Sequence, residues 1–299
     1  FSLVNLIFIW ELLFSRAKSS DQVTLIIFSK NRPFELSSFI ASFLDNVTGV
    51  SSVRVVYSGS SEKILECYRA LQAEIPPSAT QQFVFIDEVE IGGFRSAARA
   101  ACCSSDGKVC FAVDDLLVLK KLDLQEVASR LSVGEIFSCR LGLNTTYCYT
   151  RDQAQSQPDK LLRTSNAEEI AWKISSGQLD FAYPFSMDFH ILPRSLVKST
   201  LFFMRYKAPN SLEGCFDPQR IIFSLWTLRS FKTQSVVNLP LTRVQSENNN
   251  RCAGLDPESS LIWFQNGLMY DWRSIDVSVL NSPHMEIECG LVERRLRRE

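Results

Sequence analysis

Short apolar runs alternate with helical patterns in the first part of the chain, and this alternation limits the possible folds most strongly. The runs are rich in β-branched and aromatic residues and occupy residues 23–28, 53–57, 83–86 and 110–113. Apolar or small residues recur at three- and four-residue steps between them, over residues 34–44, 62–75 and 94–103. Regular alternation of this kind predicts an α/β fold with a mostly parallel, doubly wound sheet flanked by helices.

The composition is that of a globular protein with ample core-forming material. The 299 residues are 45% hydrophobic and 22% charged, and 32 Lys and Arg face 33 Asp and Glu. A formal charge of -1 gives no bulk attraction to a polyanion, so we expect no nucleic-acid partner. The nine cysteines show no CxxC pairing, and several lie in apolar runs where a reduced thiol is expected.

Polar side chains follow each predicted strand. The first strand ends in Ser29-Lys30-Asn31-Arg32, the second in Tyr57, the third in Asp87 and the fourth in Asp114-Asp115. Ligands of open α/β sheets bind beyond the carboxyl ends of the strands, where the strand order reverses. The chain has no GxGxxG after the first strand and no GxxxxGK[ST], so the dinucleotide fingerprint and the P-loop are absent.

The adjacent carboxylates Asp114 and Asp115 are the most unusual feature of this pattern. Two neighbouring carboxylates repel, and a divalent cation or a shared proton relieves the repulsion. Oxygen ligands suit Mg²⁺ or Mn²⁺, which commonly accompany phosphates. The alternative is an exposed turn in which the two acids cap the next element.

The second half of the chain is less regular. Alternating aromatic and polar residues over 180–194 predict a strand with Ser186, Asp188 and His190 on one face. We also expect a helix over 212–231, either continuous or broken at Pro218 into a loop and a second helix. A strand over 235–238, a helix over 256–265 and an edge strand over 284–289 are expected to follow.

In combination these features resemble the nucleotide-sugar glycosyltransferases of the GT-A type. Phe111-Ala112-Val113-Asp114-Asp115 is similar to the DxD region of that superfamily, with Val113 where the outer Asp would often stand. The resemblance covers residues 23–289 and implies one GT-A-like domain over 21–292. Residues 21–120 would then bind the nucleotide sugar, and residues 121–292 would form a less regular acceptor and catalytic half.

The resemblance also implies roles for particular residues. A nucleoside-diphosphate sugar would be the donor, Mn²⁺ or Mg²⁺ the cofactor, and a carbohydrate or glycoconjugate the acceptor. The implied metal ligands are Asp114, Asp115 and His284. The implied phosphate and nucleoside contacts are Ser29, Lys30, Arg32, Tyr57, Asp87 and Arg95. An inverting enzyme needs a general base, for which the candidates are Asp188 and Glu213.

Each of these roles has a structural alternative. Arg32 and Arg95 could be surface arginines, Tyr57 a core residue, and Glu213 a first-turn helix acid. For the whole chain, the alternatives are a nucleotidyltransferase acting on sugar phosphates and a non-catalytic nucleotide- or carbohydrate-binding module. A nucleotidyltransferase would normally carry a glycine-rich phosphate loop after the first strand, and residues 29–33 contain no glycine.

The two ends of the chain suggest further segments. Residues 1–20 begin with the apolar run FSLVNLIFIWELLF, which predicts either the remnant of a signal or anchor helix or a core-packing helix. The first alternative implies membrane association, in the secretory pathway and Golgi-like, and the second a cytoplasmic protein. The basic residues of 293–299 are expected to form a solvated tail.

Overall fold

A computed structural model of the chain describes residues 20–80, 82–103, 107–215, 223–241 and 254–296. The apolar run at the start and residues 297–299 lie outside these ranges, so the expectations for them stay predictions. Among the described helices, none combines the length and the apolar character that a membrane crossing requires.

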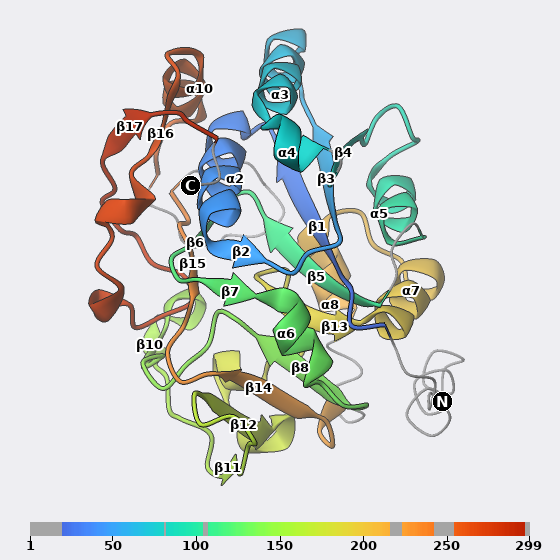
Figure 1. The fold of residues 1–299 in the computed structure, drawn as a ribbon, viewed down its shortest axis with the longest axis vertical. Coiled ribbons are helices and arrows are strands. Elements are labelled where there is room, and N and C mark those ends of the chain that lie inside the picture. The colour runs from blue at the N-terminus through green and yellow to red at the C-terminus, as the bar shows by residue number, and fades with distance from the viewer. Residues whose placement is uncertain (1–19, 81, 104–106, 216–222, 242–253, 297–299) are drawn as a thin grey trace.

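The centre of the protein is a nine-stranded sheet with the order β11-β12-β14-β8-β13-β5-β1-β3-β4 (Figure 1). Its strands are β1 (Val23–Lys30), β3 (Ser52–Ser58), β4 (Phe83–Asp87), β5 (Lys108–Val113), β8 (Glu135–Ser138), β11 (Leu161–Leu162), β12 (Glu169–Lys173), β13 (His190–Pro193) and β14 (Thr227–Phe231). The four predicted strands of the first half are β1, β3, β4 and β5, and they pair in parallel as expected.

The second half extends this sheet with mixed pairing. β13 is antiparallel to both β5 and β8, β8 is parallel to β14, and β12 is antiparallel to β14. Most strands therefore share one direction, which β13 and β12 oppose. β1 has β3 on one side and β5 on the other, so the strand order reverses between β1 and β5. The carboxyl ends of these two strands carry the segments after Phe28 and Val113.

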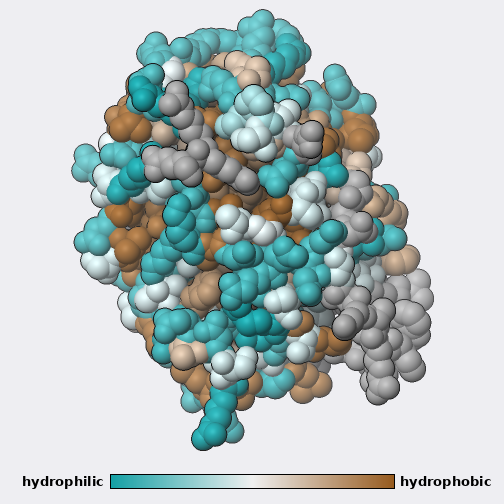
Figure 2. All heavy atoms as spheres, in the orientation of Figure 1, coloured by the Kyte–Doolittle hydropathy of each residue, from teal (hydrophilic) through white to brown (hydrophobic). Residues whose placement is uncertain are grey.

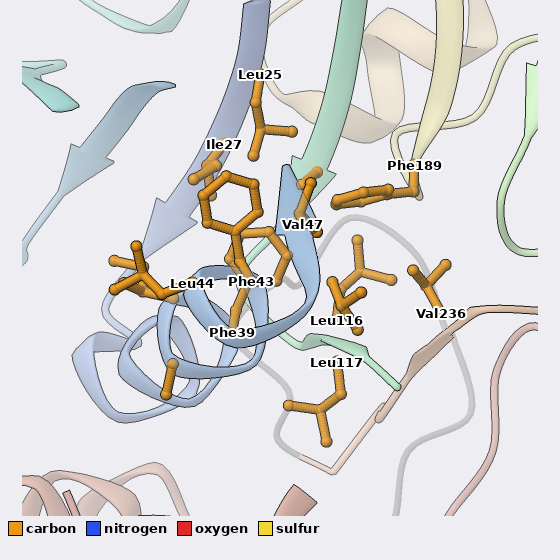
Figure 3. Close-up of a cluster of buried hydrophobic side chains, with 14 of the residues drawn as sticks. Leu25, Ile27, Phe39, Phe43, Leu44, Val47, Leu116, Leu117, Phe189 and Val236 are labelled. Atoms are coloured by element: carbon orange, nitrogen blue, oxygen red, sulfur yellow. The ribbon is translucent and has the colours of Figure 1, made fainter. Parts of the chain in front are cut away.

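Side chains of the parallel strands alternate between two apolar layers. Leu25 and Ile27 of β1 face one layer, whereas Ile26 and Phe28 face the other. Both layers are closed to water, which explains why these strands read as continuous apolar runs and not as alternating ones. Figure 3 shows the first layer, in which Phe39 and Phe43 of the helix after β1 lie against Leu25 and Ile27.

Helices cover both faces of the sheet (Figure 1). The main helices are α2 (Pro33–Asn46), α3 (Glu62–Glu74), α5 (Phe94–Cys103), α6 (Leu124–Ser129), α7 (Arg194–Phe203), α8 (Pro209–Gly214) and α10 (Pro257–Gln265). α2 and α3 pack in the first layer and α5 and α7 in the second. Local signals set their starts: Pro33 opens α2, and the Ser61 hydroxyl accepts a hydrogen bond from the Ile64 N–H at the start of α3.

Three expectations for the second half are wrong. Residues 180–189 form a short 3₁₀ helix (Leu179–Ala182) and turns, because Leu179 and Phe189 have positive φ and break the extended backbone. Of the predicted helix over 212–231, the first residues belong to α8, whereas residues 227–231 form β14, where pairing with β8 and β12 outweighs the helical periodicity. Residues 216–222 lie outside the described ranges. Residues 284–289 form no strand, and His284 makes a single bridge to Asn238.

Other expectations for this half are confirmed. β15 (Val236–Asn238) lies in the region predicted as a strand and pairs with β6 (Leu116–Val118). α10 begins after the Asp256 cap and ends at Asn266, followed by Gly267 with a φ of 70°. The minor two-stranded sheets add β2 (Val47–Thr48), β7 (Leu122–Asp123), β9 (Tyr147–Cys148), β10 (Gln153–Ala154), β16 (Leu268–Tyr270) and β17 (Leu291–Glu293).

The C-terminal segment packs against the rest of the protein. α10 and β16 contact α2, and β17 pairs with β16 (Figure 1). Arg294 pairs with Glu74 of α3 at 2.7 Å and stacks on the ring of Phe264, while Leu296 is buried. Arg294 and Leu296 are therefore docked where a solvated tail was expected, whereas Arg295 is exposed. The face shown in Figure 2 mixes hydrophilic and hydrophobic side chains.

Candidate functional site

The acid pair after β5 lies at the point where the strand order reverses, as the sequence predicts. A single guanidinium nitrogen, Nη1 of Arg32, lies 3.1 Å from Asp114 Oδ1 and 2.7 Å from Asp115 Oδ2. The Lys30 N–H donates to Asp114 Oδ2 at 3.3 Å, and Asn238 Nδ2 donates to Asp115 Oδ1 at 2.7 Å. All four carboxylate oxygens thus accept a hydrogen bond from the protein.

The three side chains of this cluster are almost closed to solvent. Their exposed fractions are 11% for Arg32, 6% for Asp114 and 13% for Asp115. Burial raises the pKa of Asp114 to about 7, although the charge of Arg32 acts in the opposite direction. Burial opposes the charge on Arg32, but the carboxylates of Asp114, Asp115 and Glu35 outweigh it and raise the pKa of the guanidinium.

Tyr68 of α3 connects the end of β1 to the next strand. Its hydroxyl lies 2.6 Å from Ser29 Oγ and accepts a hydrogen bond from the Arg32 N–H at 3.0 Å. The ring of Tyr57 packs on Tyr68 with 4.8 Å between centroids. Tyr57 is opposite Asp87 in the register of β3 and β4, so the candidate nucleoside contacts share one edge of the sheet.

Lys30 has an exposed side chain at the same edge. Asn31, with a φ of 59°, turns the chain between β1 and α2, and its side chain accepts a hydrogen bond from the Ser60 N–H at 2.7 Å. The loop after β1 is therefore tied to the loop after β3. This arrangement leaves an ammonium group at the edge where ligands of such sheets bind.

A second polar cluster forms around Asp188. Asp188 Oδ2 lies 3.2 Å from His284 Nε2 and 3.5 Å from Arg140 Nη1, and Arg140 Nη2 also binds Asp180 at 3.1 Å. Against the effect of burial, the hydrogen bond from His284 and the charges of His284 and Arg140 lower the pKa of Asp188 to about 2. His284 has a raised pKa, because the bond to Asp188 outweighs its burial.

Glu213 of α8 belongs to the same cluster. Its Oε1 accepts a hydrogen bond from the Met187 N–H at 2.6 Å, which places it beside the turn that carries Asp188. Burial and the negative charge of Asp188 raise the pKa of Glu213 to about 7. The pKa values of the two candidate bases therefore differ widely. Asp188 stays ionised, whereas Glu213 can exchange a proton near neutral pH.

Asn238 at the end of β15 links the two clusters. Its side chain donates to Asp115, and the Leu239 N–H donates to the backbone oxygen of Asp115 at 2.8 Å. Its backbone bridges to His284, whose ring binds Asp188. A continuous path of hydrogen bonds and backbone pairing thus connects the acid pair to the polar cluster around Asp188.

The predicted three-ligand metal site does not fit this arrangement. Across the described residues, no three His, Cys, Asp or Glu side chains gather as metal ligands would. Arg32 occupies the space between Asp114 and Asp115, and His284 is turned to Asp188. A guanidinium supplies the positive charge that the sequence pattern assigns to a cation.

Two candidate residues have other surroundings. Arg95 lies over the ring of Tyr206 at 5.8 Å and donates to the backbone oxygen of Phe202 at 3.3 Å, so its described contacts are with α7 and the segment after it. His190 is completely buried, and burial lowers its pKa to about 3. Neutral His190 is a core residue of β13.

Sequence reasoning missed three members of the site, Tyr68, Arg140 and Asn238. In the sequence, Tyr68 is part of the apolar face of a predicted helix, and Arg140 is a single charge within an apolar run, residues 136–142, that predicts a strand. The only signal for Asn238 is its position at the end of a predicted strand, where a polar side chain can lie near a ligand site. A polar cavity of about 130 Å³ lies away from all of them, lined by Glu135, Leu162, Arg163, Thr164, Ser165, Ala171, Thr227 and Arg229.

Comparisons with known proteins give similarities at the level of structure. No protein-family model matches the chain, and no curated protein matches it. The fragment 1–349 of S. aureus TarS superposes with a TM-score of 0.45 and 11% identity, over 72% of this chain. This chain spans 59% of the length of that fragment.

Two further solved structures show weaker similarity. The mannosyltransferase PcManGT from Pyrobaculum calidifontis, solved in complex with GDP-Man and Mn²⁺, has a TM-score of 0.31 and 15% identity over 49% of each chain. A nucleotidyl transferase from Methanothermobacter thermautotroptrophicus has a TM-score of 0.33 and 9% identity, over 70% of this chain and 86% of that one.

Proposed function

We propose that this protein is a glycosyltransferase that moves a sugar from a nucleoside-diphosphate donor to the hydroxyl group of a carbohydrate or glycoconjugate acceptor. The observation that carries the proposal is the path from the acid pair through Asn238 to Asp188, His284 and Glu213. It joins a candidate donor site at the strand-order reversal to a candidate proton-transfer site. The proposal includes a GT-A-like arrangement with a donor half over 21–120 and an acceptor half over 121–292.

The donor would lie along the carboxyl edge of β1, β3 and β4. Lys30 offers an exposed ammonium group to the diphosphate, while Tyr57 and Asp87 offer an aromatic face and a carboxylate for the nucleoside. Ser29, the remaining candidate, is buried with its hydroxyl against that of Tyr68 and would support this edge from below. Arg32 holds Asp114 and Asp115 in place and limits the negative charge that the diphosphate meets. Arg95 has no part in this assignment.

Glu213 is the proposed general base. The acceptor hydroxyl gives its proton to the Glu213 carboxylate while its oxygen attacks the anomeric carbon and the bond to the diphosphate breaks. A pKa of about 7 suits this step near neutral pH. Asp188, ionised at the same pH, orients His284 and keeps a fixed negative charge beside Glu213. The transfer is then an inverting one.

The proposed mechanism needs no divalent ion. Arg32 fills the space between Asp114 and Asp115 that Mn²⁺ or Mg²⁺ would occupy. Assays with EDTA and with added Mn²⁺ would show whether an ion displaces the guanidinium. Equal turnover under both conditions is the expected result.

The direct test is incubation with a panel of nucleoside-diphosphate sugars and simple glycoside acceptors, with products identified by mass spectrometry. We expect release of a nucleoside diphosphate, and a loss of kcat of about 10²- to 10⁴-fold in Glu213→Gln. Glu62→Gln, which changes an exposed acid of α3, is the matched control. Release of pyrophosphate from a nucleoside triphosphate and a sugar phosphate would establish the nucleotidyltransferase alternative, and donor binding without turnover the binding module.

A further inference from the structure

The outer face of α5 and α7 concentrates positive charge. The two helices and the segment up to Lys207 span residues 94–103 and 194–207, and these stretches contain no Asp or Glu. They contain Arg95, Arg99, Arg194, Lys198, Arg205 and Lys207. In a chain with 32 basic and 33 acidic residues, this is a strong local imbalance. We call these stretches the α5–α7 face.

Two adjacent phenylalanines are exposed at the centre of this charge. Phe202 and Phe203 end α7 with exposed fractions of 40% and 51%. Lys198, one turn earlier, and Arg205 and Lys207, just after, are exposed as well. Adjacent exposed apolar residues with a polar rim are typical of a protein or membrane interaction site, whereas isolated ones are common on any surface.

The protein holds these phenylalanines in a fixed position. Arg99 donates from Nε to the backbone oxygen of Leu201 at 2.9 Å and from Nη2 to that of Phe202 at 2.7 Å. Its guanidinium also lies 4.9 Å from the centre of the Phe202 ring. Two of the last carbonyls of α7, those of Leu201 and Phe202, are thereby satisfied, and Arg99 ties the end of α7 to α5.

We propose that the α5–α7 face binds the surface of an anionic lipid bilayer. Aromatic rings that enter the headgroup region, surrounded by lysine and arginine side chains that reach the lipid phosphates, are the features of an interfacial membrane site. A protein partner fits less well, because exposed basic residues flank the two exposed phenylalanines on both sides along the chain. The nearest acids along the chain are Asp106, three residues after α5, Glu90, four residues before it, Asp188 before α7 and Glu213 after Lys207. The proposal is independent of the glycosyltransferase assignment.

Vesicle sedimentation tests the proposal directly. The full chain is mixed with vesicles of phosphatidylcholine alone or with about 30% phosphatidylglycerol. We expect binding to the anionic vesicles only, and a loss of binding when the salt concentration rises to about 1 M. Failure of the wild-type chain to sediment with anionic vesicles, or equal binding to neutral ones, would overturn the proposal.

Variants separate the charge from the aromatic contribution. The triple change Lys198→Gln, Arg205→Gln and Lys207→Gln is expected to lower the partition coefficient roughly 100-fold, since each basic residue near an anionic surface contributes about 1 kcal/mol. Three exposed basic residues elsewhere serve as the charge-matched control, in the triple change Arg151→Gln, Lys160→Gln and Lys232→Gln. An equal loss in the control would show attraction by net charge alone and would refute a defined face.

The aromatic contribution has its own pair of variants. Phe203→Ser is expected to reduce binding about tenfold, because one partly exposed ring no longer enters the bilayer. Val133→Ser, at a site exposed by 59% and distant in the sequence, is the control. Circular dichroism before sedimentation verifies that each variant is folded. Unchanged binding of folded Phe203→Ser would contradict insertion of the ring.

Discussion

Arg32→Gln tests whether a guanidinium holds the acid pair at the switch between β1 and β5. The change removes two contacts, at 3.1 and 2.7 Å, from side chains that are at most 13% exposed. At an effective dielectric constant of about 20, each contact contributes about 5 to 6 kcal/mol of attraction, and desolvation of the three charges offsets most of it. Removal of one partner from a buried ion pair costs about 3 to 5 kcal/mol, and we expect a loss of about 3 kcal/mol in unfolding free energy at pH 8.

The pH dependence of this loss makes the test specific. Asp114 has a folded pKa raised to about 7, above the ordinary 3.8, so its contribution to stability falls as the pH rises from 3.8 towards the folded pKa. In the wild-type protein this decline ends near pH 7. Without Arg32 the pKa of Asp114 rises further, so the variant continues to lose about 1.4 kcal/mol per pH unit above pH 7.

Urea unfolding followed by circular dichroism at pH 5, 7, 8 and 9 measures both effects. Arg69→Gln is the matched control, because its pair with Glu62 is 58% and 65% exposed and is screened by solvent. Stability curves for Arg32→Gln and the wild-type protein that run parallel between pH 7 and pH 9 would refute the role of Arg32 as the counter-ion of Asp114. So would a variant as stable as the wild type at pH 8.

Single substitutions at Glu213, Gly107 and Tyr68 test three further features of the structure. The folded pKa of Glu213 is raised from 4.5 to about 7, so the free energy of unfolding falls by up to about 3 kcal/mol as the pH rises from 4.5 to 7. Glu213→Gln should flatten that slope in urea unfolding, and an unchanged slope would contradict the assignment. Gly107→Ala should lower the free energy of unfolding by at least about 2 kcal/mol, because φ is +78° and a Cβ atom would stand 2.2 Å from a backbone oxygen. Gly214→Ala is the control, since a Cβ atom there has open space and should cost almost nothing. Similar melting temperatures for the two variants would disprove this. Tyr68→Phe should cost about 1 to 3 kcal/mol, since it leaves Ser29 without the hydroxyl at 2.6 Å, and a wild-type melting temperature would speak against that hydrogen bond.

The first half of the fold was predictable because its strands are buried on both faces. Continuous β-branched runs such as residues 23–28 predict buried strands, and the helices between them begin at recognisable signals such as Pro33 and Ser61. The second half depends on contacts between distant segments. β14 has a helical pattern in sequence, and only its pairing with β8 and β12 makes it a strand.

The sequence predicts the edge of the sheet at which the candidate site lies, but not which side chains pair with one another there. Asp114 and Asp115 lie where the pattern placed them, and Asp188, Glu213 and His284 gather in one cluster. The interaction of Arg32 with both acids could not be read from the sequence, because a positive charge near two carboxylates is compatible with a phosphate or metal site as well. Backbone turns decide such a choice, and the turn at Asn31 directs Arg32 inward.

Binding of a nucleoside diphosphate at the edge formed by β1, β3 and β4 is the claim on which the proposed function rests. Isothermal titration calorimetry with UDP, GDP, CDP and TDP in the presence of EDTA tests it most directly. We predict that one of these nucleotides binds to the wild-type protein, and that Lys30→Gln weakens its binding about tenfold while Lys232→Gln leaves it unchanged. Absence of heat with every nucleotide, with EDTA and again with Mn²⁺, would contradict the proposed donor site.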